Sequence, residues 1–286
     1  MIEKQGNSLS LWLFRNLFDQ KSIDHFISTR AGGCSNPPYD SLNLGLHVGD
    51  DKNSVITNRE ILAANLGAPL DNFTLTNQVH GAKVKIISDD MRGRGSIHSL
   101  EAERFSADAM ITNVPNIYLM ILLADCVPVL IFDRKKKVIG VIHAGWKGTV
   151  SLITQNTVKI LKDTFHCSSK NLFAGIGPSI GPCCYAVGSE VVACIQEVFP
   201  DEKKLVTRKE PDGKIFFNLW EANRLQLLRM GIPEENIEIS RICTSCHHIR
   251  LFSYRYQKRQ TGRFGAGIML KGTEAFFSAS TKAKIV

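Results

Sequence analysis

The chain has 286 residues, of which 44% are hydrophobic and 22% charged, a composition typical of an ordinary globular protein rather than a disordered one. No apolar run is long enough to span a bilayer, and the first residues, MIEKQGNSLSLWLF, lack the succession of a secretory signal, so we expect a cytoplasmic protein with no membrane partner. The net charge is +8, but the basic residues are scattered along the chain, so we expect no nucleic acid partner.

Short apolar segments rich in β-branched residues and separated by turn residues predict strands. In chain order they lie at 24–29, 73–77, 83–88, 107–111, 118–124, 128–133 and 137–143. Helical periodicity predicts helices at 54–66, with Asn53 or Ser54 as the cap, and at 148–163, 188–198 and 218–231. The strands of the first half leave no room for crossover helices, which favours an α+β fold with mixed or antiparallel sheets. No repeat or linker marks a boundary, so we expect a single domain, residues 1–286.

Three potential metal ligands lie at strand ends or in the links between strands. His80 lies in the link between the second and third predicted strands, Cys126 directly follows an apolar run, and His143 ends another. A catalytic zinc takes three ligands from His nitrogen and Cys sulfur and keeps a fourth position open for water or substrate. These three residues would supply such a set. The same spacing also fits a Cys126 nucleophile activated by His143, as in cysteine hydrolases, and a buried structural role fits each residue alone.

The remaining cysteines give weaker signals. In a cytoplasmic chain, eight cysteines indicate buried thiols, metal ligands or catalytic groups rather than a disulfide framework. CTSCHH (243–248) fits the haem pattern C-x-x-C-H and a redox or half-zinc pattern, but no second C-x-x-C exists to complete a four-cysteine site. Cys183 and Cys184 lie in a glycine-rich turn, GIGPSIGPCCYAVG, whose spacing is not that of a dinucleotide-binding loop. A loop that faces the substrate is one interpretation of this turn.

The segment LFSYRYQKRQTGRFGAGIML (251–270) interleaves aromatic residues with Arg255, Lys258, Arg259 and Arg263. The planar fork of arginine suits phosphate or carboxylate, and the aromatic rings could stack on a base. An edge strand with inward aromatic and outward charged side chains predicts the same pattern. Both interpretations stay open at this point.

Taken together, several segments resemble the multicopper polyphenol oxidoreductase or laccase-domain family, the YfiH-like group, some members of which are described as purine nucleoside phosphorylases. The motifs that carry the resemblance are TNQVHG (76–81), ADCVPVLIFD (124–133) and VIGVIHAGWKGT (138–149), and further matching stretches lie at 28–51, 107–112, 175–188 and 252–270. Almost the whole chain is covered. The joint order of QVHG, ADC and HAGW is specific, whereas each motif alone is weak.

The resemblance implies a four-layer α/β/β/α sandwich with mixed β-sheets, and a zinc ion held by His80, Cys126 and His143. It also implies phosphorolysis of adenosine, inosine or 5′-methylthioadenosine to a base and ribose 1-phosphate, with adenosine deamination as a second activity. Zinc lowers the pKa of bound water toward neutrality, which gives the deamination a chemical rationale. The expected partners are a purine nucleoside and phosphate, bound by a monomer or homodimer.

Five residues receive roles close to the chemistry in this hypothesis. Cys126 and His143 are catalytic as metal ligands or, in a hydrolase, as nucleophile and base. Asp108 and Asp125 are candidates to orient ligands or to transfer a proton. Gln78 is a candidate for the same roles and for substrate binding.

The candidate substrate-binding cations are Arg59, Lys147 and Arg255, because phosphate requires cationic donors. The family commonly has Arg-Arg after FSY, whereas this chain has Arg255-Tyr256, so the second arginine of that pattern is replaced here. Related chains often lack the second cysteine of CTSC, which favours an incidental Cys246.

Three alternatives differ in class from the phosphorylase. A copper-dependent polyphenol oxidase is the historical family alternative, but such enzymes need several histidine-rich centres, and eight scattered histidines supply them poorly. A cysteine hydrolase is suggested by Cys126 and His143. A non-catalytic binding module with structural zinc is the third, and a closed four-ligand site would favour it.

Overall fold

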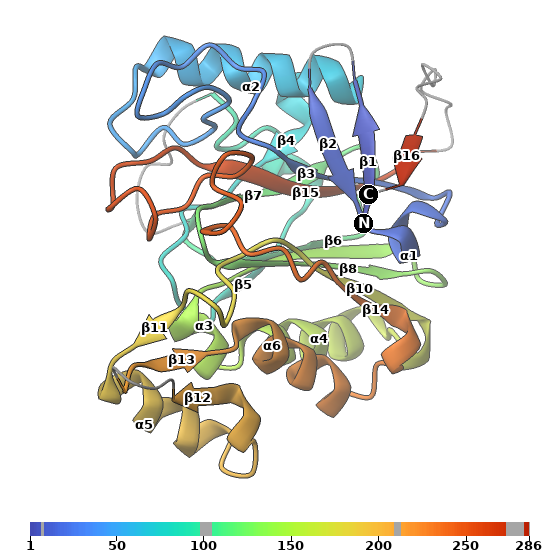
Figure 1. Ribbon diagram of the computed structural model, residues 1–286. Coiled ribbons are helices and arrows are strands. Elements are labelled where there is room, and N and C mark those ends of the chain that lie inside the picture. The colour runs from blue at the N-terminus through green and yellow to red at the C-terminus, as the bar shows by residue number, and fades with distance from the viewer. Residues whose placement is uncertain (7–8, 98–104, 209–212, 273–282, 286) are drawn as a thin grey trace.

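Four layers of secondary structure make up the computed structural model of the chain (Figure 1). The structure describes residues 1–6, 9–97, 105–208, 213–272 and 283–285. Two β-sheets form the inner layers, with α2 on the outer face of one and α3, α4 and α6 on the outer face of the other. Within the described ranges, no helix combines the length and the apolar character needed to cross a membrane.

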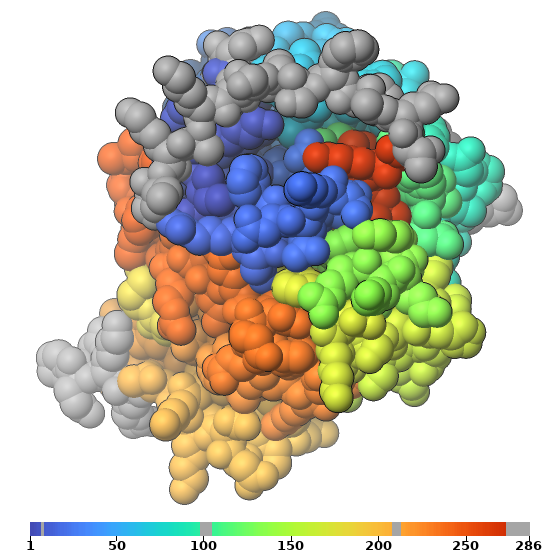
Figure 2. All heavy atoms as spheres, turned by 90° about the vertical axis from the view of Figure 1, so that its right-hand side faces the viewer, coloured from blue at the N-terminus to red at the C-terminus, as the bar shows by residue number. Residues whose placement is uncertain are grey.

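Both inner sheets are mixed. The first has seven strands in the order β16 (Ala283–Ile285), β1 (Ile2–Gln5), β2 (Ser10–Leu13), β3 (Ile23–Ser28), β15 (Phe264–Leu270), β7 (Tyr118–Leu123) and β4 (Phe73–Thr74). The second has six in the order β14 (Ile237–Ile239), β10 (Leu172–Ile176), β8 (Val127–Asp133), β9 (Val138–Ala144), β6 (Ala109–Thr112) and β5 (Val84–Ile86). The pairs β4–β7, β10–β14 and β5–β6 are parallel, and the other pairs in these sheets are antiparallel. The pairing of β15 with β3 and of β16 with β1 brings the two ends of the chain side by side, blue against red in Figure 2.

The helices form the outer layers. They are α1 (Arg15–Phe18), α2 (Lys52–Leu66), α3 (Trp146–Val150), α4 (Ile153–Phe165), α5 (Ser189–Val198) and α6 (Leu219–Arg229). A small antiparallel sheet, β11 (Ala186–Val187), β13 (Ile215–Phe217) and β12 (Val206–Arg208), lies beside α3 together with α5 (Figure 1).

Three apolar cores separate the four layers. They arise because successive side chains along a strand point to opposite faces of its sheet. On β8, Leu130 and Phe132 point into the core between the sheets, whereas Val129 and Ile131 point into the core beneath α4 and α6. On β7, Leu119 faces the other sheet and the alternate side chains face α2. Strands that are buried on both faces have nearly continuous apolar sequences, which is why these runs predict strands so clearly.

The predicted fold class is confirmed, and each of the seven predicted strands has a counterpart in the structure. The helix predicted at 148–163 is two helices, because Leu152 adopts a left-handed conformation with φ of 59° between α3 and α4. The cap of α2 is Asp51, which accepts a hydrogen bond from the backbone N–H of Ser54, rather than Asn53 or Ser54.

The aromatic and basic residues between 252 and 260 form turns rather than an edge strand. The backbone N–H of Gln257 donates to the carbonyl of Ser253 at 3.0 Å, and that of Arg259 donates to the carbonyl of Tyr254 at 2.9 Å. These local bonds curl the segment instead of extending it along a sheet. The edge-strand interpretation of this segment is therefore wrong. The strand that follows, β15, begins at Phe264 and lies inside the seven-stranded sheet.

Candidate metal centre and active site

Side chains from three separate segments meet where the chain passes between the two sheets. His80 lies in the link from β4 to β5, Cys126 in the link from β7 to β8, and His143 near the end of β9. Both links cross from the seven-stranded to the six-stranded sheet. The ligand atoms of the three residues all lie within 4.8 Å of one another, and the two imidazole rings stand edge to face with centroids 4.8 Å apart. The fold therefore brings together the three residues that the sequence singles out.

The buried carboxylate of Asp108 holds both histidine segments in place. One oxygen, Oδ1, lies 2.9 Å from Nδ1 of His143 and accepts the backbone N–H of His80 at 2.9 Å. The other oxygen accepts the backbone N–H of Gly81 at 2.7 Å. Burial works against the charged carboxylate, but the hydrogen bonds from His143 and from the backbone lower the pKa of Asp108 below its usual value. Since Nδ1 of His143 is engaged, Nε2 is the nitrogen available to a metal ion.

Cys126 and His143 shift each other's pKa toward the thiolate and imidazolium forms. Although burial raises it, the pKa of Cys126 is lowered to about 6, because the charge of His143 and hydrogen bonds from His143 and His80 stabilise the thiolate. Burial opposes the charged form of His143 as well, yet the neighbouring Cys126 and Asp108 raise its pKa to about 9. A thiolate is the form of cysteine that binds metals and attacks electrophiles.

The backbone around the three residues is unusually close-packed. A Cβ added at Gly145 would lie 3.0 Å from Sγ of Cys126, so a side chain at this position would press on the thiol. His80 and Asp125 have φ of 60° and 93°, in the left-handed region that residues other than glycine rarely adopt. Such strain at a cluster of reactive side chains is typical of functional sites.

Two adjoining cavities open onto the cluster, and His80, Cys126, Trp146 and Tyr185 line both of them. The smaller, of about 330 Å³, is otherwise lined by apolar side chains, by Asp125 and by the exposed Lys147. The larger, of about 590 Å³, has a basic wall. Its basic residues are His47, Arg59, Arg255 and Arg263. Cavities of this size suit a small organic molecule and a neighbouring anion.

Asp125 lines both cavities and Gln78 lines the larger one, and the side chains of both are hydrogen-bonded to neighbouring segments. Asp125 accepts hydrogen bonds from the hydroxyl of Thr244 and the backbone N–H of Arg255, both at 2.6 Å. The side-chain amide of Gln78 donates to the carbonyl of Leu122 at 2.9 Å and accepts its N–H at 2.8 Å. Both side chains therefore join the segments around His80 and Cys126 at the cavity wall.

The three predicted cations differ in their surroundings. Arg59 is buried, and its guanidinium donates to the carbonyls of Leu44, Gly95 and Ser96. Lys147 is exposed at the smaller cavity, with Nζ 5.7 Å from the centre of the Trp146 ring. Arg255 lies at the larger cavity with its guanidinium 5.3 Å from the centre of the Tyr185 ring.

His47, Trp146 and Tyr185 are among the cavity-lining residues that sequence reasoning did not single out. Each lies inside a stretch that carries the family resemblance, at 28–51, 138–149 and 175–188 respectively. Their position in those stretches is the signal that could have identified them.

Comparison with known proteins agrees with this geometry. The model of a family described as multi-copper polyphenol oxidoreductase laccase matches residues 24–271. The chain belongs to this family. It is 38% identical over 242 residues to purine nucleoside phosphorylase YlmD of Geobacillus stearothermophilus, covering 85% of this chain and 88% of that protein. It is 33% identical to a protein named adenosine deaminase RL5 from an unknown prokaryotic organism, covering 88% of this chain and 95% of the relative.

A solved structure shows the same fold in this family. The crystal structure of a hypothetical protein YfiH from Bacillus licheniformis superposes with a TM-score of 0.85 at 34% identity, covering 92% of this chain and 97% of that one. The family relatives thus carry phosphorylase and deaminase names, and the cluster of His80, Cys126 and His143 has the composition of a metal site.

Proposed function

We propose that this chain is a zinc-dependent purine nucleoside phosphorylase that acts on adenosine, inosine and 5′-methylthioadenosine and also deaminates adenosine. The observation that carries the proposal is the convergence of His80, Cys126 and His143 within 4.8 Å at the junction of two cavities. The names of the relatives supply the substrate class.

The donor set fits zinc. Two imidazole nitrogens and one thiolate sulfur are borderline and soft ligands, which zinc accepts in tetrahedral sites. Asp108 fixes the tautomer of His143 through Nδ1 at 2.9 Å, a common arrangement around zinc-bound histidine. When bound, zinc supplies a Lewis acid and makes water more acidic, which is the chemistry that deamination of a purine needs.

The apolar side chains around the smaller cavity suit a purine base. Trp146 and Tyr185 offer aromatic faces, and Val79, Ile180 and Leu219 complete the apolar lining. Stacking against aromatic rings stabilises a flat heterocycle without requiring a particular substituent. This lining therefore fits an enzyme that accepts more than one purine nucleoside.

The basic wall of the larger cavity suits phosphate. Phosphorolysis breaks the bond between the ribose and the base and forms a bond from the same ribose carbon to a phosphate oxygen, so phosphate must lie beside the ribose. Arg255 and Arg263 each donate from Nη1 to backbone carbonyls, and Nη2 of each is the group proposed to donate to phosphate. Arg59 contributes its charge, because all three of its guanidinium nitrogens donate to carbonyls. Lys147 is the cation on the base side.

A product analysis tests the proposal. Purified protein is incubated with adenosine in the presence and absence of phosphate, and the products are separated by chromatography. Adenine and ribose 1-phosphate are expected only with phosphate, and inosine is expected without it. The Cys126→Ala variant is expected to lose the zinc ion held with His80 and His143 and both activities together. Absence of both activities from metal-loaded wild-type protein would contradict the proposal and favour a binding module.

A cysteine hydrolase is the second candidate, because Cys126, His143 and Asp108 also have the order of a nucleophile, a base and an orienting carboxylate. The two proposals separate on metal removal. A chelator that strips zinc abolishes a metal-dependent activity, whereas it leaves a cysteine nucleophile intact. The proximity of His80, a second imidazole on the same thiolate, favours the metal site.

A further inference from the structure

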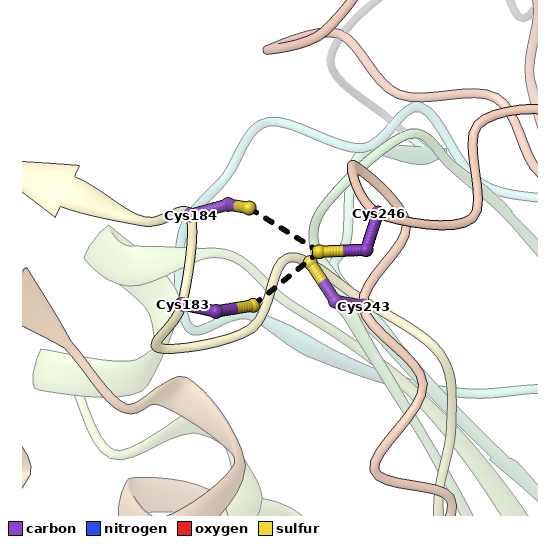
Figure 3. A group of neighbouring side chains, drawn as sticks. All are labelled: Cys183, Cys184, Cys243 and Cys246. Carbon is purple, nitrogen blue, oxygen red and sulfur yellow. Dashed lines mark hydrogen bonds between the residues drawn. The ribbon is translucent and has the colours of Figure 1, made fainter.

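Four cysteines gather in a second cluster, outside the candidate active site. Cys183 and Cys184 lie in the turn between β10 and β11, and Cys243 and Cys246 lie in the turns that follow β14. Their side chains point toward one another from two loops (Figure 3). All four sulfur atoms lie within 4.8 Å of one another. The absence of a second C-x-x-C therefore does not exclude a four-cysteine site, because the adjacent Cys183 and Cys184 lie close to Cys243 and Cys246.

The spacing of the sulfur atoms matches a tetrahedral metal site. Zinc binds thiolate sulfur at ~2.3 Å, which places the sulfurs of a tetrahedral tetrathiolate ~3.8 Å apart. The sulfur of Cys246 lies 3.6 Å from that of Cys183 and 3.5 Å from that of Cys184. Little movement is needed to surround an ion.

The backbone holds the two loops in register for such a site. The N–H of Gly181 donates to Sγ of Cys243 at 3.2 Å, a contact that stabilises a thiolate. The N–H of Thr244 donates to the carbonyl of Ser179 at 3.0 Å. Cys243 is buried, whereas Cys183 and Cys246 are exposed, so an ion can enter from solvent.

We propose that Cys183, Cys184, Cys243 and Cys246 bind a second zinc ion, whose role is structural. Four thiolates fill a tetrahedral coordination sphere and leave no position for substrate, which is the arrangement of structural zinc sites. The ion joins two loops that are distant in the sequence, since Cys184 and Cys246 are 62 residues apart. Binding free energy at such a site adds to the stability of the folded chain.

The joined loops support the candidate active site. Tyr185, next to Cys184, lines both cavities, and Thr244, next to Cys243, donates to Asp125 at 2.6 Å. Asp125 precedes Cys126. Loss of the second ion should therefore loosen the cavity wall and lower the activity. This effect on activity rests on the proposed function, whereas the binding of zinc by the four cysteines does not.

Metal content tests the proposal directly. Protein purified under reducing conditions and dialysed against zinc is expected to hold about two zinc ions per chain. The double variant Cys243→Ser and Cys246→Ser should hold about one, as should Cys126→Ala, which removes the other site. Cys194→Ser on α5, outside both clusters, is the matched control and should keep both ions.

The visible absorption of bound cobalt identifies the ligands of the second cluster. It also allows a single substitution to be used in place of the double variant, in case the double variant folds poorly. Cobalt-loaded Cys126→Ala should show the visible absorption of a tetrahedral tetrathiolate, and Cys246→Ser alone, on the wild-type background, should lose that absorption while it keeps the other site. An ion content that the cysteine substitutions of the second cluster leave unchanged would overturn the proposal, whereas a single ion that these substitutions remove would count only against the site at Cys126. A disulfide in place of the ion, seen as a lower intact mass of the protein after purification, would overturn the proposal as well.

Discussion

Replacement of Asp108 by asparagine tests the most consequential contact of the candidate active site. The carboxylate accepts from His143, from the N–H of His80 and from the N–H of Gly81 through two oxygens. An amide has one oxygen, so its NH₂ group must face one of these donors. An unsatisfied buried donor costs about 1 to 3 kcal/mol, and loss of a carboxylate behind a metal-bound histidine typically costs about 10- to 100-fold in metal affinity. We expect Asp108→Asn to weaken zinc binding by about that factor.

Competition with a chromophoric chelator measures this affinity, in the Cys246→Ser background so that a single site is titrated. Asp133→Asn is the matched control, because Asp133 is equally buried and accepts the N–H groups of Lys135 and Lys136 at 2.7 and 2.8 Å, at the opposite end of β8 from Cys126. The control should lose stability but keep wild-type zinc affinity. Equal zinc affinity in Asp108→Asn and wild type would refute the role assigned to the carboxylate.

Three further predictions concern Gly145, the basic wall of the larger cavity and a buried histidine of the core. Gly145→Ala should weaken zinc binding by about tenfold, since its Cβ would lie 3.0 Å from Sγ of Cys126, and a chelator titration checks this. Arg263→Ala should raise the KM for phosphate at least about tenfold and leave the KM for the nucleoside nearly unchanged, with Arg229→Ala as the control in steady-state kinetics. Burial lowers the pKa of His25 from 6.5 to about 4, so the unfolded chain binds the extra proton first and stability should fall by about 3 kcal/mol as pH drops from 6.5 to 4. Denaturant unfolding checks this, and His25→Gln should flatten that part of the curve.

The sequence was most informative where burial alone decides structure. Strands such as β8 and β9 are covered on both faces, so their continuous apolar runs identify them directly. The break between α3 and α4 carries no such signal, because Leu152 adopts φ of 59° without a glycine or proline to announce it. The cap of α2 was predicted at Asn53 or Ser54, the polar residues nearest to the apolar pattern, whereas it lies at Asp51.

For the candidate site, too, some residues could be predicted from the sequence and others could not. The three proposed ligands could be selected from residue type and strand position, and the family motifs supported the choice. The hydrogen bonds of Gln78 to Leu122 could not be foreseen, since they depend on how two distant segments pack. The same holds for the four-cysteine cluster, whose members come from two loops that only the folded chain brings together.

Anomalous X-ray scattering at the zinc absorption edge, from a crystal of the zinc-loaded protein, tests the proposed catalytic metal site most directly. We expect a peak within bonding distance of His80, Cys126 and His143, with the fourth position facing the two cavities. The absence of anomalous density between these three side chains in crystals that contain zinc would contradict the proposed site.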